Sequence, residues 1–140
     1  MNNHEKLKEF YNYKYWREIQ RNQLGVSANL HFVFSSAIYG FILNLLIEKN
    51  CCLSNCEKFI FIISLIFQTF SLFFYGLFIQ NRLKDSQETA KLIYEEKPFV
   101  EIRNSTLETG KKTWKYYYCQ RNLLIVGLII SLIGFSIYIF

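Results

Sequence analysis

Four cysteines and two histidines are the residues of this sequence best suited to metal or redox chemistry. Cys51, Cys52 and Cys56 are clustered, whereas His4 and His31 are far from them along the chain. Zinc ordinarily needs four tetrahedral ligands, or three and a water, so this spacing predicts no metal site. Three clustered cysteines leave one unpaired within a chain. We interpret them either as free thiols or as the source of a bridge between chains.

The sequence lacks the usual signatures of an enzyme. No serine or cysteine has the accompanying histidine that would activate it as a nucleophile. The run Gly110-Lys111-Lys112-Thr113 matches the end of a phosphate-binding loop, but the upstream glycine of that motif falls at Ser105, so the match fails. The sequence therefore predicts a protein that is not an enzyme, with no catalytic residues and no cofactor.

Three apolar blocks without any charged residue dominate the chain, at residues 24–47, 59–80 and 123–140. Of the 140 residues, 51% are hydrophobic and 19% aromatic, which excludes a disordered chain. A bilayer core about 30 Å thick requires about 20 residues of helix, so each block is long enough to span it. We predict an all-α integral membrane protein with three transmembrane helices and long helices that extend into the cytoplasm.

The basic residues predict the orientation of these spans. Of the 16 Lys and Arg residues, only Lys49 and Lys58 lie in the loop at 48–58, and the other 14 lie in residues 1–23 and 81–122. Basic residues resist translocation, so we expect the N-terminus and the 81–122 segment on the cytoplasmic side and the C-terminus outside. The net charge of +5 then reflects membrane anchoring, and duplex nucleic acid is not an expected partner.

Helix is expected to continue beyond the spans. Residues 1–23 are rich in basic and aromatic residues, which is typical of a helix that contacts lipid headgroups. Residues 81–97 should continue the second span, and Pro98 should break the helix. We expect a connector at 99–110, with Thr106 or Thr109 capping the helix that leads into the third span.

Polar and small residues inside the spans form stripes at helical spacing. In the third span, the stripe of Gly127, Ser131 and Gly134 predicts close packing against another helix. The corresponding stripes of the first two spans are candidates either for helix packing or for the lining of a pore. The pore-lining candidates are Asn29, Ser36, Asn44, Ser64, Gln68 and Ser71.

His31 is the one histidine inside a predicted span. The unperturbed pKa of histidine, about 6.5, would suit a titratable gate. The alternative is a neutral imidazole that is hydrogen-bonded to Ser27 or Ser35, each one helical turn away.

The order of segments resembles a known family. A cytoplasmic helix, a span, a short outer loop and a second span that continues into a cytoplasmic helix resemble the SLATT domain, over residues 1–97. The runs Arg82-Leu83-Lys84-Asp85 and Gly110-Lys111-Lys112-Thr113-Trp114 look like those of uncharacterised small bacterial membrane proteins, and the third span departs from the two-span plan. The resemblance implies an effector of bacterial antiphage defence (abortive infection) in the inner membrane, gated by a nucleotide that a partner enzyme makes.

Three spans cannot enclose a water-filled path, so a pore would need a homo-oligomer of four or more copies. The cytoplasmic basic residues of such an assembly would attract an anionic nucleotide or oligonucleotide, although anchoring to membrane lipids is the simpler role for each. The alternative function is a non-conducting scaffold or accessory subunit that anchors a cytoplasmic partner. The candidate ligand contacts are Arg82, Lys84, Lys111, Lys112, Lys115 and Arg121.

Overall fold

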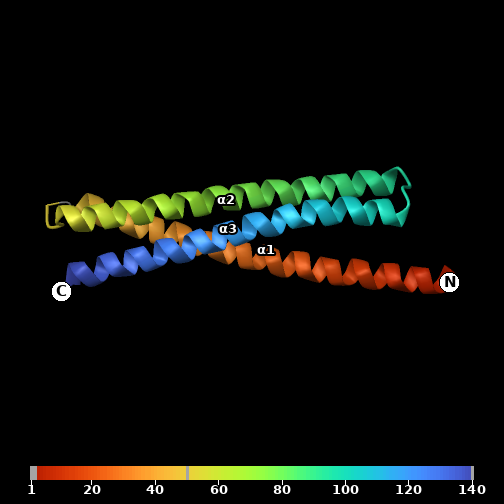
Figure 1. Ribbon diagram of the computed structural model, residues 1–140, viewed down its shortest axis with the longest axis horizontal. Coiled ribbons are helices and arrows are strands. Elements are labelled where there is room, and N and C mark those ends of the chain that lie inside the picture. The colour runs from red at the N-terminus through yellow and green to blue at the C-terminus, as the bar shows by residue number, and fades with distance from the viewer. Residues whose placement is uncertain (1–2, 50, 140) are drawn as a thin grey trace.

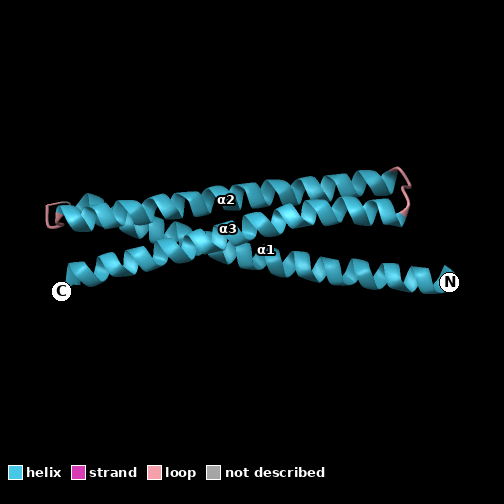
Figure 2. Cartoon of the chain, in the orientation of Figure 1, coloured by secondary structure: helices cyan, strands magenta, loops and turns pink. Residues whose placement is uncertain are grey.

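Three long α-helices make up the part of the chain that the structure describes (Figures 1 and 2). The computed structural model describes the backbone of residues 3–49 and 51–139 and the side chains of residues 15–49, 51–98 and 100–139. The helices are α1 (Asn3–Glu48), α2 (Asn55–Tyr94) and α3 (Phe99–Ile139), and these residues contain no strand. The all-α prediction is confirmed. The side chains of residues 1–14, which carry much of the predicted interfacial segment, lie outside the described residues.

The helices α2 and α3 form a long antiparallel hairpin, and α1 crosses it at an angle (Figure 1). The N-terminus and the α2–α3 connection lie at one end of the molecule, and the C-terminus and the α1–α2 connection lie at the other. The helices contain 46, 40 and 41 residues, or about 60–70 Å each at 1.5 Å per residue. Each helix is thus about twice as long as a bilayer core is thick.

Short connections join the helices. Ser54 caps α2: its hydroxyl accepts from the Glu57 amide at 3.3 Å, and the Glu57 carboxylate accepts from the Ser54 amide at 2.6 Å. This reciprocal capping box satisfies two backbone donors that the first turn would leave unpaired. At the other end, α2 stops at Tyr94, and Glu96 takes a left-handed conformation with φ of 52°.

The predicted connector at 99–110 is wrong, because these residues form the first turns of α3. The Pro98 carbonyl accepts from the amides of Glu101 and Ile102, at 2.9 and 3.3 Å, so the proline starts a helix. Proline suits a helix start because it has no amide to satisfy there. Thr106 and Thr109 do not cap this helix, since each hydroxyl bonds to carbonyls of the preceding turn within α3.

Small and polar residues repeat every seven positions along the contact between α2 and α3. On α3 one buried series of this spacing consists of Thr106, Thr113, Gln120, Gly127 and Gly134, and on α2 another consists of Ser64, Ser71, Phe78 and Asp85. A strict seven-residue repeat keeps one seam of two helices in contact as they wind around each other. In a membrane such seams favour small residues, because these allow the backbones to approach closely.

Close approach is visible at two glycines of α3. A Cβ at Gly134 would lie 2.9 Å from the Phe61 ring, and one at Gly127 would lie 2.8 Å from the Gln68 amide nitrogen. Both distances are shorter than real Cβ contacts allow. The hairpin therefore depends on the absence of side chains at these two positions.

The helix α1 contacts the hairpin through a seven-residue series of its own. Ala28, Ser35 and Ile42 are each 0% exposed. At the C-terminal end of α1, Ile42 joins a buried apolar cluster with Leu53 and Phe61. Only the single face that meets the hairpin is buried, so α1 packs along a narrower surface than α2 or α3.

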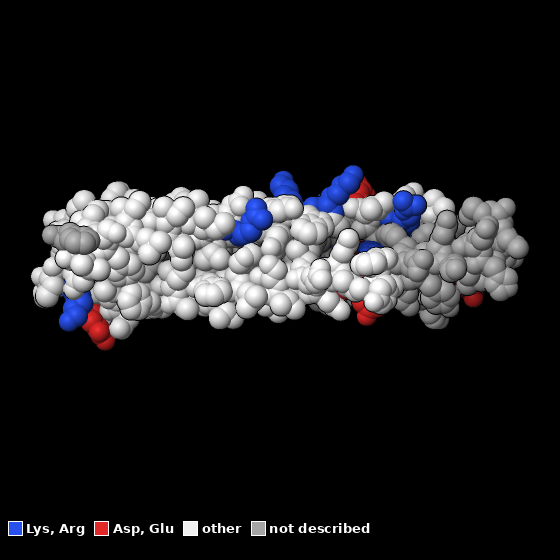
Figure 3. Space-filling model, turned by 90° about the horizontal axis from the view of Figure 1, so that it is seen from below, with Lys and Arg blue, Asp and Glu red and all other residues white. Residues whose placement is uncertain are grey.

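Large apolar side chains point outward around the middle of the molecule, which is the reverse of a water-soluble bundle. Phe34, Phe41, Phe73 and Ile129 are each at least half exposed. Figure 3 shows a wide band free of charged residues on one face, with charges beyond it on both sides. Each helix contains a stretch long and apolar enough to span a membrane. Apolar outer surfaces of this length suit lipid contact.

Candidate functional site

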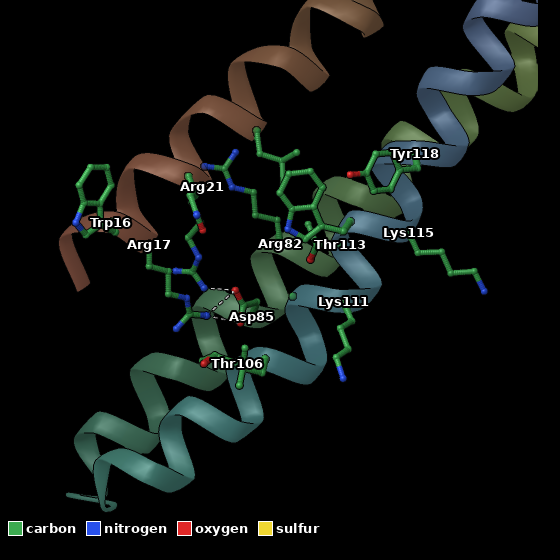
Figure 4. Close-up of a pocket in the computed structure, with 15 residues that line it drawn as sticks. Trp16, Arg17, Arg21, Arg82, Asp85, Thr106, Lys111, Thr113, Lys115 and Tyr118 are labelled. Atoms are coloured by element: carbon green, nitrogen blue, oxygen red, sulfur yellow. Dashed lines mark hydrogen bonds and ion pairs between the residues drawn. The ribbon is translucent and has the colours of Figure 1, made fainter. Parts of the chain in front are cut away.

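A cavity of about 650 Å³ lies where the N-terminal half of α1 meets the hairpin (Figure 4). Five basic residues and one acidic residue line it, together with Trp16, Trp114 and Tyr118. Its lining includes Leu24, the first residue of the first apolar block, and Arg82, two residues beyond the second block. The cavity thus lies at the boundary where the apolar blocks of α1 and α2 meet the charged parts of these helices. The charged lining residues are Arg17, Arg21, Arg82, Asp85, Lys111 and Lys115.

Asp85 is the acidic residue of this cavity, and two arginines of α1 hold it. Its side chain is 7% exposed, against 20% for Arg17 and 32% for Arg21. Arg17 Nη2 lies 3.3 Å and 3.4 Å from the two carboxylate oxygens, and Arg21 Nη2 forms an ion pair with Oδ2. A buried carboxylate must be paired to remain charged at low cost. These contacts therefore tie the N-terminal half of α1 to α2.

Arg82 extends from α2 across the cavity to α1. Its guanidinium lies over Gly25, so that a Cβ at that glycine would collide with Nη1 and lie 3.0 Å from Cζ. Arg82 forms no ion pair or hydrogen bond with any side chain that the structure describes. A guanidinium carries five N–H donors in a planar fork, so Arg82 brings unused donors to the cavity.

The candidate ligand contacts divide into two groups. Arg82, Lys111 and Lys115 line the cavity, but the ammonium groups of both lysines point away from α1, so only their stems face it (Figure 4). The other three candidates lie outside it. Lys84 pairs with Glu88 on the exposed surface of α2 at 3.7 Å, Lys112 is exposed, and Arg121 stacks over the Tyr118 ring at 5.0 Å.

Arg17, Arg21 and Asp85 were not among the predicted ligand contacts. A signal for them exists in the spacing: Arg17 and Arg21 are four apart on one face of a helix, and Asp85 continues the seven-residue series of Ser71 and Phe78 beyond the second span. What the sequence does not contain is the crossing angle that brings α1 against this part of α2.

The three pore-lining candidates of the second span lie inside the chain's own helix contacts. Ser64, Gln68 and Ser71 are each 0% exposed. The Ser64 hydroxyl donates to the Gly127 carbonyl at 2.8 Å, and the Ser71 hydroxyl donates to the Gln120 carbonyl at 2.9 Å. In the single chain these residues thus join α2 to α3 and do not face a water-filled path.

A polar node joins all three helices at the middle of the molecule. The Ser35 and Ser71 hydroxyls lie 3.1 Å apart, and the Gln120 amide donates to the Ala28 carbonyl at 3.1 Å. Gln68 differs from these residues, because neither atom of its buried amide has a hydrogen-bond partner. An unpaired buried amide costs free energy. Gln68 is the one described side chain with two unpaired buried polar atoms, whereas His31, Gln120 and Arg121 each have one.

The candidates of the first span are placed differently. Asn29 and Asn44 are exposed and Ser36 is half-buried. The Asn29 side chain accepts from the Tyr75 hydroxyl at 2.8 Å, whereas Asn44 has no hydrogen bond with the described residues. Together with Gly40, these residues form a polar stripe on the outward side of α1. We call it the α1 stripe.

His31 does not form the hydrogen bonds expected from its neighbours. The Ser27 hydroxyl lies 2.8 Å from the Tyr117 hydroxyl, and the Ser35 hydroxyl pairs with Ser71. Both serines are therefore engaged by other helices, while the His31 ring lies 5.6 Å from the Tyr117 ring. The buried Nδ1 atom of His31 has no partner.

All four cysteines are free thiols in the structure. Cys51, Cys52 and Cys56 are exposed around the α1–α2 connection, and Cys119 is half-buried on α3. No group of residues able to hold a metal ion occurs in the described part of the chain.

The fold and its apolar outer surface define the class of this chain, a multi-pass membrane protein with three long helices. No protein-family model matches the chain, and no curated protein or solved structure is significantly similar to it. Its function must therefore be argued from the α1 stripe and the cavity alone.

Proposed function

We propose that this protein is the subunit of a homo-oligomeric membrane pore that is gated from the cytoplasmic side. The observation that carries the proposal is the α1 stripe. The Asn29 oxygen accepts from Tyr75 of α2, but the Asn29 amide nitrogen and the Asn44 amide have no hydrogen bond with the described residues. Such exposed polar groups are costly at the depth of a bilayer unless they meet water or another helix. Copies of the chain arranged around an axis would bring their stripes together and give these groups a polar environment.

The pore is assigned to α1 because the other polar stripes are already in use. Ser64, Gln68 and Ser71 are buried between α2 and α3, so a pore lined by them would require the hairpin to open. A pore lined by α1 leaves the α2–α3 hairpin intact and places this hairpin between α1 and the lipid. It needs four or more copies, since fewer helices leave no room for water at the axis.

The charge distribution supports a cytoplasmic location for the cavity. Its end of the molecule carries the N-terminus and the α2–α3 connection, and 14 of the 16 basic residues belong to that side. We therefore place the N-terminus in the cytoplasm and the C-terminus outside, in a bacterial inner membrane. A SLATT-type antiphage effector, gated by a nucleotide or a partner protein, fits this arrangement.

Ion flux from liposomes that contain the purified protein tests the pore. We expect flux to fall sharply in a variant that carries both Asn29→Leu and Asn44→Leu. Thr69→Val is the matched control, because Thr69 is exposed on α2 and its hydroxyl bonds only to its own helix, at the Leu65 carbonyl. Native mass spectrometry should show four or more copies. A strictly monomeric protein, or no flux with any nucleotide or partner, would exclude the pore.

One observation favours a second candidate, a scaffold. The hairpin continues for 14 residues of α2 beyond the second apolar block, from Asn81 to Tyr94, or about 21 Å. Several large apolar side chains are exposed there, including Ile93 at 58% and Tyr94 at 90%. Such a surface could anchor a cytoplasmic protein. Oligomers that never conduct but do retain a cytoplasmic protein would favour this function.

A further inference from the structure

The cavity at the cytoplasmic end has an excess of positive charge that its own residues do not neutralise. The guanidinium groups of Arg17, Arg21 and Arg82 line it and Asp85 is the acidic residue of the lining, whereas the ammonium groups of Lys111 and Lys115 point away from α1. Asp85 is engaged with Arg17 and Arg21. Arg82 has no ion pair with the described side chains. The cavity therefore leaves guanidinium donors and net charge for a bound anion.

We propose that this cavity binds a phosphate group, either of an anionic lipid headgroup or of a free phosphate compound, which Arg82 holds together with the arginine pair of α1. Planar guanidinium groups match the oxygens of phosphate in charge and in hydrogen-bond geometry. Three of them reach the cavity from two helices, Arg17 and Arg21 from α1 and Arg82 from α2. An anion bound among them would bridge α1 to the hairpin.

Asp85 occupies the position of a competing anion in the cavity. Its carboxylate accepts from Arg17 and Arg21, and the Arg17 contacts of 3.3 and 3.4 Å are longer than the 2.7–2.9 Å usual for such pairs. A phosphate monoester or a pyrophosphate carries more negative charge than one carboxylate and offers more acceptor oxygens; a lipid phosphodiester carries one charge, as Asp85 does, and would also accept from Arg82. Binding would therefore draw the arginines from Asp85 toward the ligand and change how α1 sits on α2.

The size and place of the cavity suit both sources of phosphate. Small-molecule sites commonly measure about 300–1,000 Å³, and this one measures about 650 Å³. Trp16, Trp114 and Tyr118 surround the basic residues, and aromatic side chains of this kind favour the headgroup layer and also stack on rings. Basic pockets between helices at the cytoplasmic face also bind lipid headgroups.

The proposed phosphate site rests on the proposed function in one respect only: the ligand arrives from the cytoplasmic side of the membrane. Phosphate binding does not require the protein to conduct. If the protein binds phosphate but does not conduct ions, the proposed pore is wrong and the phosphate site stands. If it conducts ions but does not bind phosphate, the phosphate site is wrong and the pore stands.

Tryptophan fluorescence provides a direct measurement, because the two tryptophans of the chain, Trp16 and Trp114, both line the cavity. The full-length protein is placed in phosphatidylcholine nanodiscs. In one series, phosphatidylglycerol replaces a rising share of the lipid. In the other, inorganic pyrophosphate or adenosine monophosphate is added to nanodiscs of phosphatidylcholine alone. We expect a saturable change in at least one series, and the series that responds identifies the source of the phosphate.

Substitutions of opposite sign separate a binding site from a structural role. Arg82→Gln should weaken binding by about tenfold, the order expected for one lost charge-assisted hydrogen bond. Asp85→Asn should strengthen binding several-fold, because it removes the competing carboxylate while it keeps the side-chain size. Lys112→Gln is the charge-matched control: Lys112 is exposed and absent from the lining, so its loss should change binding less than twofold.

Three outcomes would overturn the site. The first is the absence of a saturable response in both series. The second is equal weakening by Lys112→Gln and Arg82→Gln, which would show that only the overall charge matters. The third is weaker binding in Asp85→Asn, in a protein whose circular dichroism shows intact helices, which would mean that Asp85 supports the site and does not compete for it. Arg17→Gln gives an independent test if Arg82→Gln does not fold.

Discussion

The contact between α2 and α3 and the contact of α1 with this hairpin show two ways of holding a helix in a membrane protein. Along the hairpin, small residues repeat every seven positions and let the backbones meet, as at Gly127 and Gly134. α1 has only a short series of this spacing, Ala28, Ser35 and Ile42. It is held at separate points: apolar clusters around Ala28 and Ile42, the polar node at Ser35, and the ion pairs of Asp85. The first contact is continuous, and the second depends on a few contacts that a ligand or another copy can replace.

This difference bears on function. A pore or a regulated scaffold needs one element that moves against one that does not. Packing at close backbone distance leaves little freedom, because a buried seam cannot shift without opening voids. Point contacts of polar and charged groups can be exchanged for contacts with water, lipid or a ligand at lower cost. We therefore expect the hairpin to be the rigid part and α1 the part that moves against it.

The largest expected effect comes from filling the hairpin seam. Gly134→Val places a branched side chain where even a Cβ would lie 2.9 Å from the Phe61 ring. Overpacking of this kind typically costs about 1–3 kcal/mol, and we expect a value near the top of that range. Thermal unfolding in detergent, followed by circular dichroism, measures it.

Gly76→Val is the control for this substitution. A Cβ at Gly76 meets nothing within 4 Å, and the change in helix propensity is the same. Equal unfolding temperatures for the two variants would show that the hairpin is no more tightly packed than an exposed surface.

A smaller effect is expected from releasing α1. Asp85→Ala leaves Arg17 and Arg21 without their carboxylate partner. Breaking a buried pair costs about 3–5 kcal/mol, but both arginines are partly exposed and can regain water, so we expect about 1–2 kcal/mol. The loss should appear as faster hydrogen exchange of α1 residues 15–24, with α2 and α3 unchanged.

Glu95→Ala serves as its control, since Glu95 pairs with Lys91 on the exposed surface at 3.8 Å and should contribute about 0.3–0.5 kcal/mol. If Asp85→Ala accelerates exchange in the hairpin as much as in α1, the two contacts are not independent and the division into rigid and movable parts fails.

The smallest effect concerns Gln68, whose buried amide has no hydrogen-bond partner among the described residues at either atom. Gln68→Met keeps the length of the side chain and removes an amide that has no partner. Removal of an unpaired buried polar group should raise stability by up to about 1 kcal/mol. Unchanged flux in the same variant would agree with an α1 lining. A loss of flux would instead assign the pore to the second span and would contradict the α1 lining.

Much of the architecture was predictable because it depends on local properties of the chain. Three charge-free blocks of sufficient length determine three spans, and their alternation between two ends follows from connectivity. The stripe of Gly127, Ser131 and Gly134 was visible as well, since small residues at helical spacing stand out in an apolar block. The connector at 99–110 was missed because Pro98 both ends one helix and begins another, and sequence spacing does not distinguish these roles.

The sequence by itself determined that this chain has three membrane-crossing helices and which of its residues are polar, because hydrophobic length and residue type need no partner. Only the tertiary structure decided which polar residues are used within the chain. Ser64, Gln68 and Ser71 turn toward α3, whereas Asn29 and Asn44 remain on the outside of α1. It also brought Arg17 and Arg21 to Asp85, more than 60 positions away. The physical reason is that helix crossing angles arise from the sum of many side-chain contacts, which no single stripe of sequence contains.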